Sequence, residues 1–217
     1  MGRINYSERV LARREREKRE RIDTILDAAL EVFSEKGFYN ARMEDIAEKA
    51  ALGKGTLYYY FRTKEELYLT LLKREESRLT ETLVSSINPD TSIEDFIIQV
   101  VRFFIDYFSE HKEYISVLFP IQSGFISFKD SELVKEIENL RSEFTHIAVM
   151  REMIEKILGR CKQKESGESI LYFLAIIIRG IGDFIRTGQS EKVKKSIENI
   201  LSELNLCKEK ELRDEVD

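Results

Sequence analysis

The sequence predicts an all-α protein. Its 217 residues include only ten glycines and two prolines, the residues that most often interrupt regular structure. Charged residues make up 35% of the chain, and most of them are Glu, Lys or Arg, which are good helix formers. Apolar residues recur at three- and four-residue steps along most of the chain, and a hydrophobic content of 42% is enough to build a core.

Four helices are predicted in the N-terminal third. The first ends at Gly37, and its apolar face consists of Ile22, Ile25, Leu26, Ala29, Leu30, Val32 and Phe33. The second covers about residues 43–50, and a turn through Ala51, Leu52 and Gly53 leads to a third that begins at Lys54. Thr63 can cap the fourth helix, which continues to about Ile87.

The third helix has one apolar face and one polar face. Leu57 and Phe61 lie four residues apart and can be buried together. The remaining positions are Lys54, Gly55, Thr56, Tyr58, Tyr59 and Tyr60. A buried aromatic corner is the alternative interpretation, but three consecutive tyrosines point about 100° apart and cannot all face one core. An ammonium group and hydroxyls suit DNA phosphates and base edges. They include no nucleophile–base pair, so we do not expect an enzyme.

Charge is distributed unevenly. Residues 1–62 carry a net charge of +2 within a chain whose total is −5. A basic N-terminal part allows one end to approach nucleic acid while the acidic remainder keeps the protein in solution. Cys161 and Cys207 form no metal-binding or disulfide pattern, and His111 and His146 are isolated. The longest apolar run, 170–178, is too short to span a bilayer, so we expect a cytoplasmic protein without membrane association.

Residues 3–21 contain eight Arg or Lys and four Glu. One interpretation is a solvated helical extension. The other is an arm that brings Arg13, Arg14 or Arg16 to DNA phosphates or into a minor groove. The sequence leaves both interpretations open.

Residues from about 20 to 70 resemble the DNA-binding domain of the TetR family of bacterial transcriptional regulators. The matching segments are I-L-D-A-A-L-E-V-F-S-E-K-G-F at 25–38, D-I-A-E-K-A at 45–50 and G-T-L-Y-Y-Y-F-R-T-K-E-E-L-Y at 55–68. The resemblance implies an N-terminal arm and three-helix helix-turn-helix domain at 1–66, and a larger helical effector-binding and dimerisation domain at 67–217.

The resemblance also implies DNA-contacting residues: Arg42, Lys54, Gly55, Thr56, Tyr58, Tyr59, Tyr60 and Lys64. Thr56 and Tyr58 are expected at base edges, and the hydroxyls of Tyr59 and Tyr60 at phosphates. Family members often have Gly in place of Ala51, and Ser or Thr in place of Gly53 and of the pair Ala41-Arg42. The missing hydroxyl at the start of the second helix leaves Arg42 to supply a phosphate contact.

Helices are also predicted over about 93–108, 114–128, 133–158 and 168–186, with a last one ending near Leu206. The helix at 168–186 is apolar nearly all round and must be buried on more than one side. The family's last two helices form a four-helix bundle across a dimer axis, which implies an interface formed by Ile170, Phe173, Ile177, Ile181, Phe184, Val193, Ile197 and Ile200. The alternative is a purely intramolecular core.

Aromatic side chains of the C-terminal part can line a cavity for a small hydrophobic effector. The candidates are Phe103, Tyr107, Phe119, Phe125, Phe128, Phe144, Met150 and Phe173. The alternative is that they simply pack together, and the cavity is expected mainly from the resemblance. No cofactor and no metal are expected.

The sequence therefore predicts a homodimeric regulator that binds a double-stranded DNA operator, most simply a repressor that a hydrophobic effector releases. Two other classes are weighed against it. One is a helical carrier of lipophilic ligands, whose interactions would lack the steep salt dependence of DNA binding. The other is an all-α enzyme, which would require inward-facing carboxylates or histidines in pairs.

Overall fold

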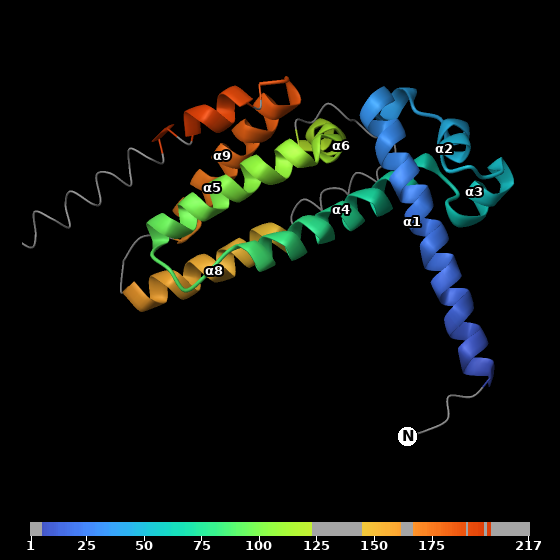
Figure 1. Cartoon of the computed structure of the whole chain (residues 1–217), viewed down its shortest axis with the longest axis horizontal. Coiled ribbons are helices and arrows are strands. Elements are labelled where there is room, and N and C mark those ends of the chain that lie inside the picture. Colours follow the sequence, from blue (N-terminus) through green and yellow to red (C-terminus); the bar gives the residue numbers. More distant parts are fainter. Residues whose placement is uncertain (1–5, 123–144, 162–166, 190, 198, 201–217) are drawn as a thin grey trace, which may run out of the picture. The chain divides into compact units, whose positions relative to one another are not determined.

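The computed structural model describes residues 6–122, 145–161, 167–189, 191–197 and 199–200. Within them there are α-helices and no strand (Figure 1). The helices are α1 (Tyr6–Asn40), α2 (Met43–Lys49), α3 (Lys54–Tyr60), α4 (Lys64–Ser86), α5 (Ile93–Glu110), α6 (Lys112–Gln122), α8 (Thr145–Cys161) and α9 (Gly167–Arg186). Residues 191–197 are also helical. None of these helices is both long and apolar enough to cross a membrane.

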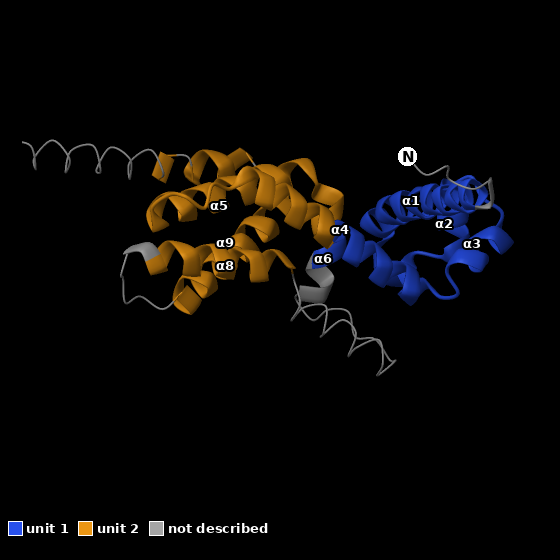
Figure 2. Ribbon diagram, turned by 90° about the horizontal axis from the view of Figure 1, so that it is seen from below, with its two compact units in different colours: residues 1–75, 116–138 blue, residues 76–115, 139–217 orange. Residues whose placement is uncertain are grey.

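The chain divides into two compact units (Figure 2). Unit 1 contains residues 1–75 and 116–138, and unit 2 contains 76–115 and 139–217. Both α4 and α6 contribute residues to each unit. The helix predicted over 133–158 lies partly outside the described residues, as does the last predicted helix beyond residue 200.

Tyr68 on α4 lies at the centre of the unit 1 core. Its ring meets Phe33 edge-on, with centroids 5.0 Å apart, and Phe38 at 4.8 Å. Its hydroxyl donates a hydrogen bond of 2.6 Å to the carbonyl of Val117 on α6, so the buried polar atom has a partner. Burial raises the pKa of Tyr68 above its usual value, and the phenol stays neutral. One side chain thus joins α1, α4 and α6.

Two left-handed residues set the turns of unit 1. Gly37 has a φ of 72° and interrupts α1 where the sequence predicts its end, although helical geometry resumes as far as Asn40. Ala51 follows α2 with a φ of 53°. The N–H groups of Ala51 and Leu52 donate to the carbonyls of Glu48 and Ala47, at 3.0 and 2.8 Å, which is the Schellman pattern. Ala51 therefore occupies a position that glycine fills most easily.

The core of unit 2 is built around the inner face of α9, which packs against α5 and α8. The buried residues of that face are Leu171, Leu174, Ile178, Ile181, Gly182 and Ile185. The opposite side of the same helix is also apolar, yet Phe173, Ile176 and Phe184 are exposed there. The sequence-based expectation that α9 needs two buried sides is consistent with this arrangement, since one subunit covers only one side.

A buried polar cluster joins three helices of unit 2. Nδ1 of His146 on α8 lies 2.5 Å from Oε1 of Glu76 on α4, and the backbone N–H of His146 donates to the same oxygen at 3.2 Å. The hydroxyl of Tyr114 on α6 donates to Oε2 of Glu76 at 3.5 Å. All three residues are less than a tenth exposed. His146, isolated in the sequence, is thus a partnered core residue.

Replacing Ala51 by glycine is expected to stabilise the protein. The substitution relieves about 1–2 kcal/mol of left-handed strain and gives back about 0.4–1 kcal/mol through the more flexible unfolded chain, so a net gain of about 0.5–1 kcal/mol should remain. Denaturant unfolding measures it. The matched control is Ala50→Gly, one residue earlier with a φ of −76°, which should destabilise instead. The same sign for both variants would contradict the strain argument.

Candidate nucleic-acid interface

The exposed side of α3 is the most distinctive polar surface of unit 1. Leu57 is fully buried and Phe61, at the C-cap, is 4% exposed, so these two residues fix one side of α3 on the core. Lys54, Gly55 and Thr56 are exposed on the other sides, together with Tyr58 (39%) and Tyr59 (78%). An exposed fraction of 78% is high for a tyrosine, because its ring is largely apolar. The surface is therefore preformed for a partner with hydrogen-bonding groups.

Lys54 is held at the start of this surface. Its ammonium group pairs with the carboxylate of Glu44 on α2 and lies 5.8 Å from the ring centroid of Tyr58. The hydrogen bond with Glu44 raises the pKa of Lys54, and the same bond lowers the pKa of Glu44. Both side chains are exposed, so the pair adds little stability and a phosphate can replace the carboxylate.

The start of α2 lacks a hydroxyl cap, as the sequence indicates. The backbone N–H of Arg42 instead donates to Oδ2 of Asp45 at 3.1 Å, and Lys36 pairs with the same oxygen at 3.0 Å. The bond from Lys36, followed by the one from Arg42, lowers the pKa of Asp45. The cap therefore does not use the guanidinium of Arg42, and Arg42 is exposed at the N-cap of α2.

Tyr59 and Tyr60 differ in their surroundings. Their rings meet edge to face, with centroids 5.2 Å apart at 89°. Tyr59 is exposed, whereas Tyr60 is half-buried. Tyr60 therefore supports the ring of Tyr59 and has less freedom to reach a partner.

Lys64 at the start of α4 has hydrogen-bond partners within unit 1. Its Nζ donates to three backbone carbonyls, those of Phe38 at 2.7 Å, Ala41 at 3.0 Å and Tyr39 at 3.3 Å. It also lies 4.5 Å from the ring centroid of Phe38, and burial lowers its pKa. All three protons of the ammonium group are thus engaged inside the protein. In this geometry Lys64 helps to position the helix-turn-helix, and the phosphate contact expected of it stays a prediction.

The residues predicted for the effector cavity are not brought together as a set. Phe103 and Tyr107 lie stacked on α5, with ring centroids 5.5 Å apart, and line a groove of about 400 Å³. Its lining also includes Thr82 of α4 and Ile87, the residue that follows α4. Met150 is buried on α8, whereas Phe173 faces outward and is 52% exposed, so its assignment to an interior cavity does not fit. The side chains of Phe119, Phe125, Phe128 and Phe144 lie outside the described residues.

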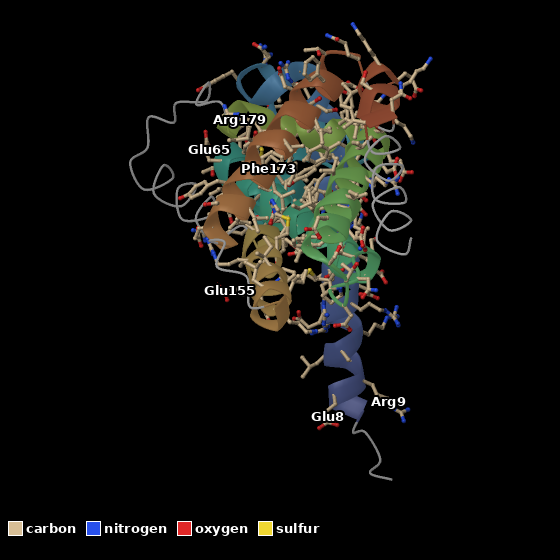
Figure 3. All side chains as sticks on the ribbon, turned by 90° about the vertical axis from the view of Figure 1, so that its left-hand side faces the viewer. Glu8, Arg9, Glu65, Glu155, Phe173 and Arg179 are labelled. Carbon is tan, nitrogen blue, oxygen red and sulfur yellow. The ribbon has the colours of Figure 1, made fainter. Side chains whose placement is uncertain are left out.

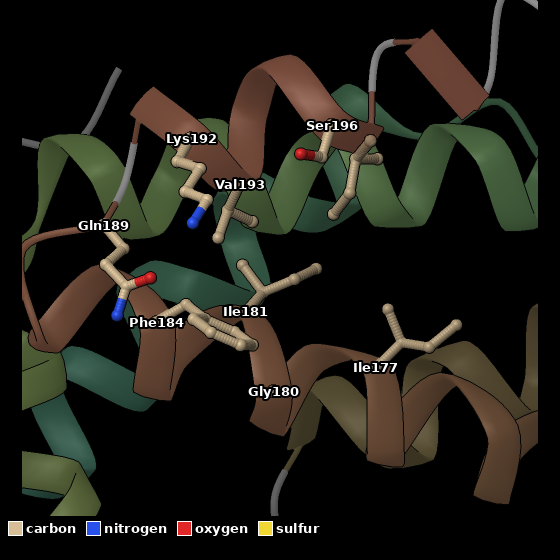
Figure 4. Close-up of a pocket in the computed structure, with 9 residues that line it drawn as sticks. Ile177, Gly180, Ile181, Phe184, Gln189, Lys192, Val193 and Ser196 are labelled. Atoms are coloured by element: carbon tan, nitrogen blue, oxygen red, sulfur yellow. The ribbon is translucent and has the colours of Figure 1, made fainter.

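Several residues predicted for the dimer interface do lie together. Ile177, Ile181 and Phe184 of α9 and Val193 and Ile197 of the following helical segment line one groove of about 440 Å³ (Figure 4). Phe173 and Ile200 are exposed, and Ile170 is half-buried. Ile181 is only 3% exposed and belongs mainly to the core of its own subunit.

Sequence reasoning missed two exposed apolar residues of α9, Tyr172 (69%) and Ile176 (73%). The spacing of the apolar residues at 173, 176 and 184, with glycine at 180, was the available signal for this side of the helix. Among the described residues there is no group of three His, Cys, Asp or Glu able to hold a metal ion.

The fold and the exposed α3 surface define the class, a helix-turn-helix protein with a second, helical unit. Comparison with known proteins narrows the class to a family. Residues 25–71 match the model of the family described as bacterial regulatory proteins, tetR family. The matched segment runs from Ile25 of α1 to Leu71 of α4 and so contains the whole helix-turn-helix, which is similar to that of this family.

Curated relatives match in the N-terminal part. The HTH-type transcriptional repressor NicS of Pseudomonas putida is 31% identical over 96 residues, which are 44% of this chain and 45% of that protein. The fatty acid metabolism regulator protein of Bacillus subtilis is 29% identical over 86 residues, 40% of this chain and 44% of that one. The matched segment thus spans less than half the length of either relative. Both are regulators, in agreement with the expectation that this chain is not an enzyme.

Solved structures share the fold over most of the chain. The fatty acid degradation regulator FadR from Bacillus halodurans superposes with a TM-score of 0.65 at 18% identity, covering 82% of this chain and 96% of that one. FadR from Bacillus subtilis, solved in complex with stearoyl-CoA, gives the same TM-score and coverage at 16% identity. These similarities confirm the predicted all-α architecture with an N-terminal helix-turn-helix.

Replacing Lys64 by methionine is expected to cost about 1–3 kcal/mol of stability, because carbonyls at the end of α1 lose their donor. Thermal or denaturant unfolding measures the loss. Lys54→Met is the matched control and should change stability by less than about 0.5 kcal/mol, since the Lys54–Glu44 pair is exposed. Equal losses in the two variants would show that the hydrogen bonds of Lys64 contribute no more to stability than the exposed Lys54–Glu44 pair does.

Proposed function

We propose that this protein is a homodimeric transcriptional regulator, a repressor that leaves its operator in the cytoplasm when a small hydrophobic effector binds. The observation that carries the proposal is the α3 surface, where Tyr58, Tyr59, Lys54 and Thr56 are exposed while Leu57 anchors the helix. The names of the curated relatives support the same conclusion.

DNA binding follows the helix-turn-helix mode. The two α3 helices of a dimer enter successive major grooves, about 34–36 Å apart along a near-palindromic site. Thr56 and Tyr58 meet base edges, and Tyr59, Tyr60, Arg42 and Lys54 meet phosphates. Gly55, which has no side chain, lets the α3 backbone approach the DNA closely. The open space around Gly55 supports this role, since no other protein atom lies within 4 Å of where a Cβ would stand.

The dimer forms through the exposed side of α9 and the helical segment after it. Phe173, Ile176 and Phe184 are each about half or more exposed, and the groove beside them is apolar. Patches of this kind usually mark a protein interface. A second copy related by a twofold axis brings the same apolar surface to this one, as an isologous interface requires.

The effector binds in unit 2. Phe103, Tyr107 and Met150 are the described candidates for its surroundings, and the stearoyl-CoA complex of Bacillus subtilis FadR supports a lipophilic ligand with an acyl chain. To release DNA, the effector must bind the conformer with mismatched α3 helices more tightly than the DNA-binding conformer.

Selection of bound sequences from random duplex DNA, at moderate salt, tests the proposal. Recovery of an inverted repeat is the expected result. A carrier of lipophilic ligands, the alternative, would recover no sequence above background and would show no steep loss of binding with rising salt. Operator affinity that stays constant across every effector that binds would contradict the release mechanism.

Tyr59→Phe should weaken binding to the selected operator and to random DNA by the same factor, about tenfold per contact, because a hydroxyl that binds phosphate carries no sequence information. Fluorescence anisotropy with both duplexes measures it. Tyr172→Phe, an exposed tyrosine of α9, is the control and should bind like the unmodified protein. A loss confined to one base position would assign Tyr59 to base readout instead.

Ile176→Glu should raise the dimer dissociation constant about 30-fold or more, since losing a central interface side chain typically costs about 2 kcal/mol or more. Sedimentation across a concentration series measures it. Val84→Glu, at an exposed apolar residue of α4, is the matched control. A dimer that survives Ile176→Glu unchanged would exclude this surface as the interface.

A further inference from the structure

The first part of α1 is exposed over most of its length in the part of the chain that the structure describes. The helix begins at Tyr6, but its first fully buried residue is Ile25. Every residue from 11 to 21 is exposed. At a rise of about 1.5 Å per residue, residues 6–21 extend about 24 Å. Figure 3 shows Glu8 and Arg9 projecting into open space from this part of the helix.

The charges of this extension are sorted by face. Residues 6–21 contain seven Arg or Lys and four Glu. Two of the arginines are neutralised within the helix, since Arg13 Nε lies 2.7 Å from Glu17 Oε1 and Arg16 Nε lies 3.6 Å from Glu20 Oε1. Arg14, Lys18 and Arg21 follow each other at steps of four and three, within about 60° on the helix surface. We call these three residues the basic stripe; no ion pair joins them to the described residues.

The basic stripe continues the face by which α1 packs on the helix-turn-helix. Further steps of four and three from Arg21 lead to Ile25, Ala28 and Val32, which are all buried. α1 is regular over this stretch, because its non-helical residue is Gly37. The stripe therefore lies on the same face of α1 as residues that are buried in unit 1 further along the helix. This face of α1 is apolar where it is buried, from Ile25 onward, and cationic where it is exposed, at residues 14–21.

An anionic partner explains that change better than a second protein helix. A helix partner would require apolar residues at these steps, and in the described extension Leu11 is the one large apolar side chain that is strongly exposed, at 60%. Two such extensions in a dimer would both be positive and repel each other. The stripe spans about 10 Å, close to the axial length of three phosphate-to-phosphate steps on one DNA strand, at about 3.4 Å each.

We propose that Arg14, Lys18 and Arg21 bind phosphates of the DNA beside the stretch that α3 reads. This inference rests on the proposed function, because it extends the same DNA site. It also replaces two of the sequence-based candidates: of Arg13, Arg14 and Arg16, only Arg14 lacks a carboxylate partner. The contacts are to phosphate alone, so they raise affinity for every sequence and leave specificity unchanged.

The test compares two triple variants that lose the same charge from different faces of one helix. The stripe variant is Arg14→Gln, Lys18→Gln and Arg21→Gln. The matched control is Arg13→Gln, Arg16→Gln and Arg19→Gln. All six side chains are exposed, so the unfolding midpoint should stay unchanged in both variants. Affinity is measured against salt concentration on two duplexes, the selected operator and a random sequence.

The stripe variant should bind both duplexes more weakly, and its plot of log affinity against log salt should be shallower by about 0.9 for each lost phosphate contact, about 2.7 per subunit. The control should keep a slope close to that of the unmodified protein. The ratio of operator to random affinity should be the same in all three proteins.

A stripe variant with the unmodified slope would overturn the inference, and so would equal decreases in both variants, which would reveal a general charge effect. Neither result touches the proposed function, which fails only if the unmodified protein selects no sequence. In that case the random duplex still tests the stripe, because phosphate binding requires no operator.

Discussion

The ammonium group of Lys64 is the constraint on which the geometry of unit 1 depends. The ammonium group, at the start of α4, donates hydrogen bonds to carbonyls at the end of α1. These bonds hold together the two ends of the segment that contains α2 and α3. Burying an ammonium is unfavourable unless its protons are hydrogen-bonded, and here three carbonyls and the face of Phe38 compensate the lost hydration. The cost of breaking this arrangement keeps the spacing between α1 and α3 constant.

The fixed spacing between α1 and α3 determines which side chains of the short helices are exposed. α3 has seven residues, and burying Leu57 in the single small core of unit 1 turns the phenol of Tyr59 into water. Such exposure forgoes the stabilisation that a buried aromatic ring would give, about 25 cal/mol per Å² of apolar surface. The domain gains in exchange a rigid, hydrogen-bonding surface whose order does not have to be established when DNA binds.

Local signals predicted much of this structure. Gly37 and the residues around Ala51 identified the ends of α1 and α2, because a left-handed residue after a helix is encoded within a few positions. The carbonyl partners of Lys64 were not predicted because they lie 23 to 26 residues away, although a cation in the first turn of a helix, where the dipole disfavours it, was a hint. Glu76 and His146 are 70 residues apart, and no periodicity reports such a pair.

Periodicity also failed for Phe173, for a different reason. A helix that is apolar all round does not reveal which side its own subunit covers, so Phe173 was assigned both to a cavity and to an interface. Burial separates the two sides, since Leu174 is fully buried and Phe173 is half-exposed. The basic extension of α1 shows the opposite case. There the charges are close together in sequence, but the i,i+4 ion pairs of the helix decide which arginines have a carboxylate partner.

The hydrogen-bonded pair Glu76 and His146 relates effector binding in unit 2 to the position of α4. Glu76 follows directly on the last α4 residue of unit 1, and α8 carries His146 beside the buried Met150. Leaving one partner of a buried hydrogen bond unsatisfied costs about 1–3 kcal/mol, so α4 and α8 stay joined at this point unless a bound molecule supplies a comparable free energy. An effector that displaces α8 must therefore either move α4 as well or replace the imidazole as the partner of Glu76. In both cases the contacts of α4, the helix that begins at Lys64, are altered.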